Sequence, residues 1–249
     1  MDDRVPTGIP GLDEILSGGL PRGRTILLCG TCGTGKTTLA IQFLHNGATR
    51  YNEPGVLITL EQNAQEIRDD MLNLGVDLKK LEDQGKLTII DTSLSKMGLT
   101  DYLNQTQTHE TGSFTLKPGE FNIENLLAVI IDTAKKTGAK RIVIDSLPAL
   151  DYLLKDKDDI RRTLITINYQ LKNQKLTTLI ITEGQDDESL SKHGVEEYIT
   201  DGVISLKVNE ALDTRTLKIR KMRVTKHTLK PTTFELTPTG VIIKTGKGN

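Results

Sequence analysis

The sequence contains no tryptophan, and aromatic residues make up only 4% of its 249 positions. The core must therefore be built mainly from aliphatic side chains, and a chain of this length can bury many of them. The formal net charge is −1, so the chain lacks the bulk basic character typical of nucleic-acid-binding proteins. The longest apolar runs, such as residues 126–131, are far shorter than a membrane span, and the N-terminus shows no secretory signal pattern. We therefore expect a globular, cytoplasmic protein with no membrane segment.

Cysteine is scarce, since the chain has only Cys29 and Cys32, three positions apart. A Cys-x-x-Cys redox pair is one interpretation of this spacing. We favour a second, in which both are packing residues in a reducing compartment. The reason is that Cys29 ends an apolar run, and a disulfide would distort the glycine-rich loop that contains Cys32.

Glycine is concentrated around the cysteines, where residues 30–37 read Gly-Thr-Cys-Gly-Thr-Gly-Lys-Thr. A β-type run (residues 26–29) precedes this stretch and an amphipathic helical segment follows it, which is the context of a phosphate-binding loop. Glycines let backbone N–H groups turn toward a phosphate, and the positive end of the following helix adds to the attraction. The alternative is a strand–helix turn without a ligand. We interpret the stretch as the binding site of a nucleoside triphosphate.

Two residues at the end of this loop and one carboxylate elsewhere in the sequence predict how the nucleotide is bound. We expect Lys36, from an exposed position, to carry a mobile charge to the β and γ phosphates, and the Thr37 hydroxyl to ligate Mg²⁺. A second β-type run leads to Asp145, whose carboxylate we expect to bind Mg²⁺ through water. The complete predicted nucleotide-binding set is Gly30, Thr31, Cys32, Gly33, Thr34, Gly35, Lys36, Thr37 and Thr38.

Alternating β-type and helix-type segments predict an α/β fold with a doubly wound, mostly parallel sheet. The expected helices cover residues 36–49, 63–74, 124–137 and 159–173, and the expected core strands cover 26–29, 56–61, 86–91, 141–146 and 177–182. Four further β-type segments separated by turn signals predict an antiparallel meander, at residues 203–208, 217–224, 232–237 and 241–244. We expect one domain over residues 1–249, with an N-terminal cap segment (1–24), a polar insertion or lid (93–122) and an antiparallel β extension (203–249).

Short motifs spread over nearly the whole chain resemble the KaiC-like ATPases of the RecA/RadA superfamily, in a single-domain, archaeal-type form. The motifs lie at residues 7–13, 18–21, 30–37, 61, 142–146, 182–183, 194–198 and 221–223. The resemblance implies a RecA-like P-loop NTPase core that uses ATP and Mg²⁺. It also implies a homo-oligomeric ring, typically a hexamer, with ATP between subunits and a regulatory protein as a further partner.

Glu61 ends the second expected core strand, and we expect it to orient the water that attacks the γ phosphate. The ordinary alternative is that Glu61 caps the next helix, where negative charge is favourable. The resemblance implies two adjacent glutamates here, whereas this sequence has Gln62 at the second position. Because glutamine can hold a water but cannot accept a proton, we expect slow hydrolysis and a nucleotide-gated binding role.

The resemblance also implies a Lys-x-Arg pair that reaches the γ phosphate of the neighbouring subunit. Lys221 and Arg223 match this pair, although Val224 stands where glycine is usual. On a strand, positions 221 and 223 share one face, as a two-pronged clamp requires. The alternative is the solvated face of an edge strand, where lysine opposes aggregation.

A DNA-recombination paralogue resembling RadA, with weak single-stranded DNA binding, is the alternative function. Such proteins place basic loops after core strands, whereas residues 184–198 carry a net charge of −4, which opposes binding to phosphate. An autokinase of the two-domain clock type is a third interpretation, but the sequence matches one ATPase domain and indicates no phosphate acceptor. We therefore favour an ATPase that acts on a protein partner.

Overall fold

The computed structural model describes residues 4–92, 114–115, 122–154, 156–184 and 190–245. Within these ranges, ten strands form one curved sheet in the order β12-β11-β10-β9-β3-β8-β7-β4-β5-β6, and β1 and β2 form a separate two-stranded ribbon. Seven strands, from β9 to β6 in that order, pair in parallel, and β10, β11 and β12 add antiparallel to β9. The strand bounds are β1 Arg4–Val5, β2 Leu20–Pro21, β3 Thr25–Gly30, β4 Gly55–Thr59, β5 Leu87–Asp91, β6 Phe114–Thr115, β7 Arg141–Asp145, β8 Thr177–Glu183, β9 Gly202–Asn209, β10 Thr214–Met222, β11 Thr232–Thr237 and β12 Gly240–Ile243.

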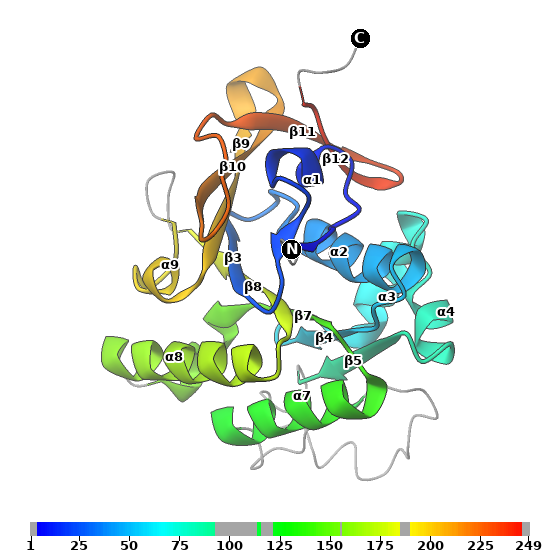
Figure 1. The fold of residues 1–249 in the computed structure, drawn as a ribbon, viewed down its shortest axis with the longest axis vertical. Helices are drawn as coiled ribbons and strands as arrows, with labels where there is room; N and C mark the ends of the chain where they lie inside the picture. Colours follow the sequence, from blue (N-terminus) through cyan, green and yellow to red (C-terminus); the bar gives the residue numbers. More distant parts are fainter. Residues whose placement is uncertain (1–3, 93–113, 116–121, 155, 185–189, 246–249) are drawn as a thin grey trace.

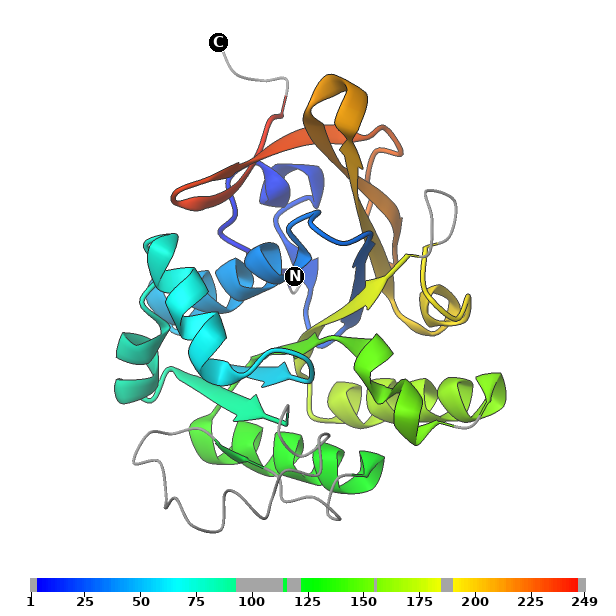
Figure 2. The ribbon, with the colours of Figure 1, turned by 180° about the vertical axis from the view of Figure 1, so that it is seen from behind.

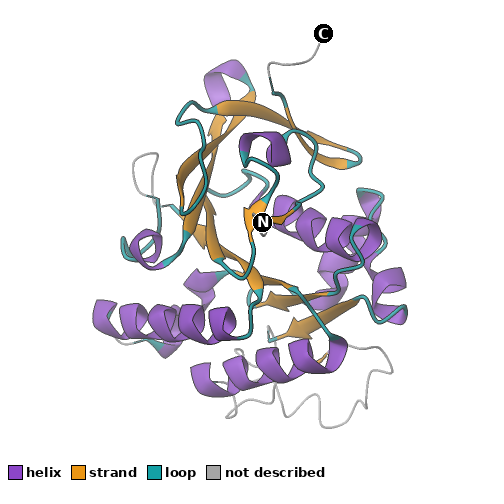
Figure 3. Cartoon of the chain, viewed as in Figure 1, coloured by secondary structure: helices purple, strands orange, loops and turns teal. Residues whose placement is uncertain are grey.

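Helices cover both faces of this sheet (Figures 1 and 3). They are α1 Leu12–Ile15, α2 Lys36–Arg50, α3 Ala64–Asn73, α4 Leu78–Asp83, α7 Ile123–Thr137, α8 Lys157–Asn173 and α9 Glu196–Ile199, with 3₁₀ turns η1 Leu147–Leu153 and η2 Glu210–Leu212. Local signals fix their ends: the Asn63 side chain caps α3 by accepting a hydrogen bond from the Glu66 N–H, and Gly138, with φ of 67°, ends α7. Among the described residues, none of the helices is both long and apolar enough to cross a membrane.

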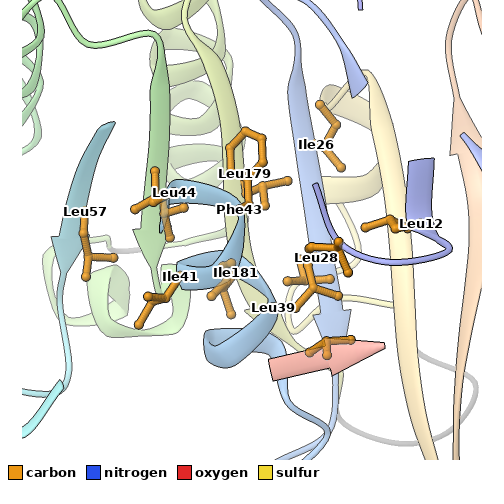
Figure 4. Close-up of a cluster of buried hydrophobic side chains, with 14 of the residues drawn as sticks. Leu12, Ile26, Leu28, Leu39, Ile41, Phe43, Leu44, Leu57, Leu179 and Ile181 are labelled. Atoms are coloured by element: carbon orange, nitrogen blue, oxygen red, sulfur yellow. The ribbon is translucent and has the colours of Figure 1, made fainter. Parts of the chain in front are cut away.

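Two aliphatic layers hold the helices to the sheet. One packs α1, α2, α3 and α4 against one face, and the other packs α7, α8 and η1 against the opposite face. Figure 4 shows the first layer, where the α2 side chains of Leu39, Phe43 and Leu44 meet strand residues such as Leu179. Each fully buried side chain of this size contributes about 1.5–3 kcal/mol relative to exposure. The largely aliphatic core expected from the shortage of aromatics is confirmed.

A buried arginine ties the N-terminal segment to the parallel core. The Arg141 side chain, at the start of β7, is completely buried and pairs with Glu53 at 2.7 Å. Its guanidinium also donates to the backbone carbonyls of Phe43 and Pro6, both at 2.9 Å. The sequence did not predict this contact, because its partners lie about 90 to 135 positions away. It fixes the position of α2, and therefore of the loop that precedes α2.

The N-terminal segment also covers the outer edge of the sheet. The backbone N–H of Ile243, in the edge strand β12, donates to the Pro10 carbonyl at 2.9 Å. A Cβ on Gly11 would lie 2.3 Å from the Ile243 carbonyl oxygen, so the two backbones approach at a distance that only glycine permits. Gln42 of α2 accepts from the Val241 N–H at 2.7 Å. The last hairpin, β11–β12, is thereby held against both the N-terminal segment and α2.

The α/β class, the mostly parallel sheet and the antiparallel C-terminal strands are confirmed. Helix α4 was missed because its six residues are too few for a clear apolar period. The expected strand over residues 217–224 was placed wrongly: β10 runs from Thr214 to Met222, so Arg223 lies beyond it. Figure 2 shows β9 and β10 continuing as a long ribbon past the parallel strands. The expected insertion or lid at 93–122 falls almost entirely outside the described residues, and the single-domain boundaries remain a prediction.

Candidate functional site

The phosphate-binding loop connects β3 to α2 at the carboxyl edge of the sheet. Gly33 has φ of 74°, a conformation that L side chains rarely adopt, and a Cβ there would point into open space. Glycine at position 33 therefore allows the positive φ and leaves the loop accessible, and it is not required by close packing. Thr34 is buried, and its hydroxyl donates to the Thr31 carbonyl at 2.9 Å, which closes the loop on itself. The shape of the loop is therefore stabilised by its own hydrogen bonds.

Lys36 opens α2 and folds back over the loop. Its ammonium group donates to the carbonyls of Gly30 and Thr31 at 2.9 and 2.8 Å. The expectation that Lys36 is exposed was wrong, because only 8% of the residue is accessible. Burial lowers the pKa of this lysine, and the negative charge of Glu183 opposes the shift. Among the described residues no carboxylate forms an ion pair with Lys36, so its charge is available to an incoming anion.

Thr37 and Asp145 meet across the loop as the sequence predicted for a magnesium site. The Thr37 hydroxyl donates to Asp145 Oδ2 at 2.7 Å. Asp145 ends β7, and burial raises the pKa of its carboxyl to about 6, helped by the nearby charge of Glu61. The Thr37 hydrogen bond lowers this pKa but does not cancel the effect of burial. A divalent cation here would relieve the desolvation of the carboxylate.

Glu61 lies two residues beyond the end of β4 and faces the same site. One of its carboxylate oxygens accepts a hydrogen bond from the Ser146 hydroxyl at 2.6 Å. The alternative that Glu61 caps α3 is not what the structure shows, because Asn63 supplies that cap. The carboxylate is therefore held toward the end of β7, beside Asp145.

These side chains line one cavity of about 360 Å³ at the carboxyl edge of the parallel strands. Ligands of open α/β sheets bind at this edge. The predicted residues that line it are Cys32, Gly33, Gly35, Lys36, Thr37, Thr38, Glu61 and Asp145. Sequence reasoning did not assign roles to four other lining residues: Ser146, Ile181, Glu183 and Leu236. The position of Glu183 at the end of a core strand already indicates the ligand-binding edge in the sequence, whereas Leu236 reaches the loop through the folding back of β11.

Lys221 and Arg223 are not among the residues that line this cavity. A register shift between Ile219 and Lys221 interrupts the pairing of β10 with β9, and Arg223 follows the strand. The shift precedes both residues, and the Arg223 N–H still donates to the Asp201 carbonyl at 2.9 Å, next to the Met222–Gly202 pair. The expectation that the two side chains share one face therefore stays a prediction. β10 lies between β9 and β11, but its pairing with β11 covers only residues 215–217, so Lys221 lies on a part of the strand for which pairing with β9 alone is seen. The alternative of an edge strand is therefore not excluded by the sheet order.

Local contacts hold both cations within the protomer. The Lys221 ammonium donates to the backbone carbonyls of Glu197 and Thr200 at 2.9 and 2.5 Å. The Arg223 guanidinium donates to Asp201 Oδ1 at 3.2 Å. The pair is thus anchored to the segment formed by α9 and the two residues after it.

The two cysteines are free thiols. Cys29 is buried at the end of β3, as expected of a packing residue, and burial raises the pKa of its thiol to about 12. Cys32 is exposed and lines the cavity, so its assignment as a packing residue was wrong. A thiol with so high a pKa is a poor nucleophile, and this argues against a redox pair.

The donor set fits a Mg²⁺–nucleotide better than a metal ion alone. No group of three or more His, Cys, Asp or Glu side chains able to hold a metal occurs among the described residues. Mg²⁺ keeps several waters and needs only one or two protein ligands when phosphate oxygens complete its shell. Thr37 and Asp145 supply two oxygens, and the loop N–H groups and Lys36 supply the contacts for phosphate.

Comparison with known proteins agrees with this geometry. Residues 5–248 match the family described as "ATPase: KaiC". The structure is similar to that of a KaiC-like protein from the hyperthermophilic archaeon Pyrococcus horikoshii, with a TM-score of 0.81 and 38% sequence identity, covering 97% of this chain and 99% of that one.

Among curated proteins, the chain is 36% identical over 242 residues to the circadian clock protein KaiC2 of Synechocystis, and 37% identical over 227 residues to the circadian clock oscillator protein KaiC of Thermostichus vulcanus. These matches cover 96% and 90% of this chain but only 40% and 41% of the relatives' length. The chain belongs to the KaiC family of ATPases.

Proposed function

We propose that this protein is a slowly hydrolysing ATPase that binds ATP with Mg²⁺ between the subunits of a homo-oligomeric ring, typically a hexamer, and whose nucleotide state controls a protein partner. The observation that carries the nucleotide part is the 2.7 Å hydrogen bond between Thr37 and Asp145, beside a buried Lys36 that no carboxylate among the described residues neutralises. A hydroxyl, a carboxylate and an unpaired cation at the start of one helix match the needs of a Mg²⁺–triphosphate.

The roles of the loop residues follow from their positions. The backbone N–H groups of residues 30–38 bind the phosphates, and Lys36 exchanges its two carbonyl partners for phosphate oxygens. Thr37 and Asp145, which the structure brings together, would hold Mg²⁺, Thr37 directly and Asp145 through water. Mg²⁺, when bound, supplies positive charge that stabilises the β and γ phosphates.

Glu61 orients the attacking water, and the hydrogen bond from the Ser146 hydroxyl holds the Glu61 carboxylate in place. Gln62 occupies the neighbouring position, and its backbone carbonyl accepts a hydrogen bond from the Thr59 hydroxyl at 2.5 Å. The amide side chain of Gln62 has no basic group to share the proton. This supports slow turnover as an intrinsic property of the site.

Lys221 and Arg223 act in trans in this proposal. Neither residue lines the cavity of its own protomer, so a role at the γ phosphate requires a second subunit. An arginine that approaches from outside stabilises the charge that develops during phosphoryl transfer. Ring assembly would then be a condition for hydrolysis.

The structure around Lys192 does not favour DNA as the partner that the nucleotide state controls. Lys192 is the single lysine or arginine in residues 184–198, and it pairs with Asp151 at 2.7 Å. Glu196 in the same stretch is completely buried and accepts hydrogen bonds from Ser191 and Val195. The described part of this stretch around Lys192 and Glu196 is therefore engaged in internal contacts, which supports a protein partner over DNA.

Mixing two inactive variants tests the proposal. Arg223→Ala subunits keep their phosphate-binding loop, and Lys36→Ala subunits keep Arg223 but bind ATP too weakly to fill their sites at the ATP concentration of the assay. If Arg223 acts in trans, mixed rings contain some complete interfaces, and steady-state ATP hydrolysis should exceed that of either variant alone. Co-assembly is checked by the solution mass of differently tagged subunits. A co-assembled mixture as inactive as its components would return Arg223 to a purely structural role.

A further inference from the structure

Asp201 is a buried carboxylate that three cations share. It directly precedes β9, and its side chain is completely inaccessible to solvent. Oδ1 accepts hydrogen bonds from Arg24 at 3.2 Å, Lys172 at 3.1 Å and Arg223 at 3.2 Å, and Lys172 also lies 3.0 Å from Oδ2. Burial alone would raise the pKa of Asp201, but the hydrogen bond and charge of Lys172, together with the charge of Arg24, bring it below its usual range. Asp201 is therefore a firm anion at neutral pH.

Arg223 is the most exposed of the three cations. Its side chain is 52% accessible, against 38% for Arg24 and 29% for Lys172. If the Arg223 guanidinium leaves, Asp201 keeps two positively charged partners, so the buried carboxylate is never stranded without compensation. The departure also relieves repulsion among three cations gathered on one carboxylate. Arg223 is thus the member that can leave at the smallest cost.

The backbone near Arg223 is fixed even though its side chain can move. The Arg223 N–H donates to the Asp201 carbonyl at 2.9 Å, and the Lys221 ammonium is held by two carbonyls of the preceding segment. On the other side, Arg4 donates to the Val224 carbonyl at 2.7 Å. Movement of the guanidinium therefore requires a change of side-chain rotamer and no rebuilding of the chain.

We propose that Asp201 is a positioning residue that retains the Arg223 guanidinium within its own protomer and competes for it with the nucleotide phosphate of a neighbouring subunit. The inference rests on the proposed action of Arg223 in trans. It identifies the Asp201–Arg223 ion pair as the contact that opposes this action. Supply of the cation to a neighbour then breaks one ion pair and forms another. The strength of the Asp201 contact sets how readily subunits assemble around Mg²⁺–ATP.

Opposite charge changes around Asp201 should have opposite effects. Asp201→Asn removes the competing charge, so assembly in Mg²⁺–ATP should need less protein and turnover should rise. Arg24→Gln and Lys172→Gln each leave the carboxylate with one cation fewer, so Asp201 holds Arg223 more tightly. Assembly should then need more protein, and turnover should fall. We expect changes of about two- to fivefold, the range of a partly exposed ion pair. Lys136→Gln, which removes an exposed lysine paired with Asp132 on α7, is the matched control and should change neither quantity.

The measurements are the protein concentration at half-assembly, from solution mass in Mg²⁺–ATP, and the steady-state hydrolysis rate. Each variant is also made in an Arg223→Gln background, where the proposal requires all three effects to vanish. Two results would overturn the proposal and show that the cluster only stabilises the fold. One is a change of assembly and turnover in the same direction for Asp201→Asn, Arg24→Gln and Lys172→Gln. The other is a change that persists in the Arg223→Gln background. If Asp201→Asn does not fold, the two cation variants and their Arg223→Gln partners decide alone. Failure of the trans role itself gives a different pattern, because Arg223→Gln alone would then leave assembly and turnover unchanged.

Discussion

The phosphate-binding loop and the Asp201 cluster treat their charges in opposite ways. At the loop, buried Lys36 rests on two neutral carbonyls, and Asp145 is desolvated enough to raise the pKa of its carboxyl to about 6. At the cluster, the Asp201 side chain is inaccessible to solvent, yet Lys172, the Thr25 N–H and Arg24 keep the pKa of its carboxyl below the usual range. The first site lacks compensation that a ligand can supply, and the second is already compensated.

This difference in charge compensation distinguishes a binding site from a structural cluster. Burial of an ion costs several kcal/mol unless a partner is present, so an uncompensated pair of buried groups remains where binding provides the missing partner. The buried charges of the loop therefore lower the stability of the fold and raise its affinity for a ligand. The Asp201 cluster stabilises the fold and releases Arg223 only when the phosphate of a neighbouring subunit competes for it. Substitutions at the two sites test the contrast.

Glu61→Gln should have the largest effect. We expect a loss of about 10²–10³ in the steady-state hydrolysis rate, because the amide cannot accept the proton of the attacking water. Affinity for Mg²⁺–ATP should stay within about threefold, since the amide oxygen can still accept the Ser146 hydrogen bond. Gln62→Glu, which adds a second carboxylate beside the first, should raise turnover. Unchanged rates in both variants would leave Glu61 with no part in hydrolysis.

Lys36→Ala should weaken ATP binding by about 10- to 150-fold, the loss of a charge-assisted hydrogen bond worth roughly 1.5–3 kcal/mol. Equilibrium binding of a fluorescent ATP analogue measures the change. Lys79→Ala, on α4, removes an exposed lysine with a carboxylate partner and should leave binding unchanged. Because Lys36 is buried over the loop, the thermal midpoint should be recorded too. Wild-type affinity in a folded Lys36→Ala protein would mean that the loop does not bind the nucleotide through this lysine.

Asp145→Asn should stabilise the ligand-free protein at pH 7–8 while weakening the Mg²⁺ dependence of ATP binding. The native pKa of Asp145 is raised from 3.8 to about 6, so the folded state binds more protons than the unfolded state between these values. The wild type therefore loses stability as the pH rises from about 4 to 6, by up to about 3 kcal/mol. The asparagine variant should lack this loss, measured as the free energy of unfolding in urea at several pH values.

Asp132→Asn, at an exposed position on α7, is the control for Asp145→Asn and should follow the wild-type pH profile. Asp201→Asn should behave in the opposite way to Asp145→Asn. Its native pKa is lowered, so wild-type Asp201 stabilises the fold above about pH 4 and loses this contribution as the pH falls through the native pKa. Parallel pH profiles for Asp145→Asn and Asp201→Asn would remove the contrast between the two sites.

Val224→Gly should give the smallest effect. Val224 has φ of 53°, a costly conformation for a β-branched residue, and it is 74% exposed, so its side chain adds little packing. Relief of this strain, less the greater freedom of glycine in the unfolded chain, should raise the free energy of unfolding by about 0.5–1 kcal/mol. Asn52→Gly, at a similar φ of 51° elsewhere, should gain less because asparagine tolerates this region better. A destabilised Val224→Gly protein would mean that the side chain contributes packing after all.

The parts of the site that lie along the chain were predictable from sequence. The loop of residues 30–38 and its helix follow from glycine placement and periodicity, and Asp145 and Glu61 follow from the rule that β-strands of such folds deliver side chains to one edge. The class of fold followed from the same alternation of strand and helix. These features depend on local patterns and on a small set of connection rules, so one sequence is enough to indicate them.

The parts that depend on contacts between distant segments were not predictable. Asp201 gave no signal, because its three cations come from residues 22 to 177 positions away. The burial of Lys36 depends on how the loop closes, and the contact of Arg223 with Asp201 depends on the register in which β10 pairs with β9. The approach of Leu236 to the cavity depends on the placement of the final hairpin. None of these follows from periodicity or composition.

The strap formed by Pro10 and Gly11 along β12 has a consequence for solubility. A sheet whose outermost strand offers free N–H and C=O groups can add strands from other molecules without limit, which is the route to amyloid-like association. Here part of that strand's hydrogen-bonding capacity is occupied by the chain's own N-terminal segment, at a separation that leaves no space for a side chain at Gly11. Growth of the sheet by edge addition at β12 is blocked there, so association through this edge is disfavoured and association through other surfaces remains open.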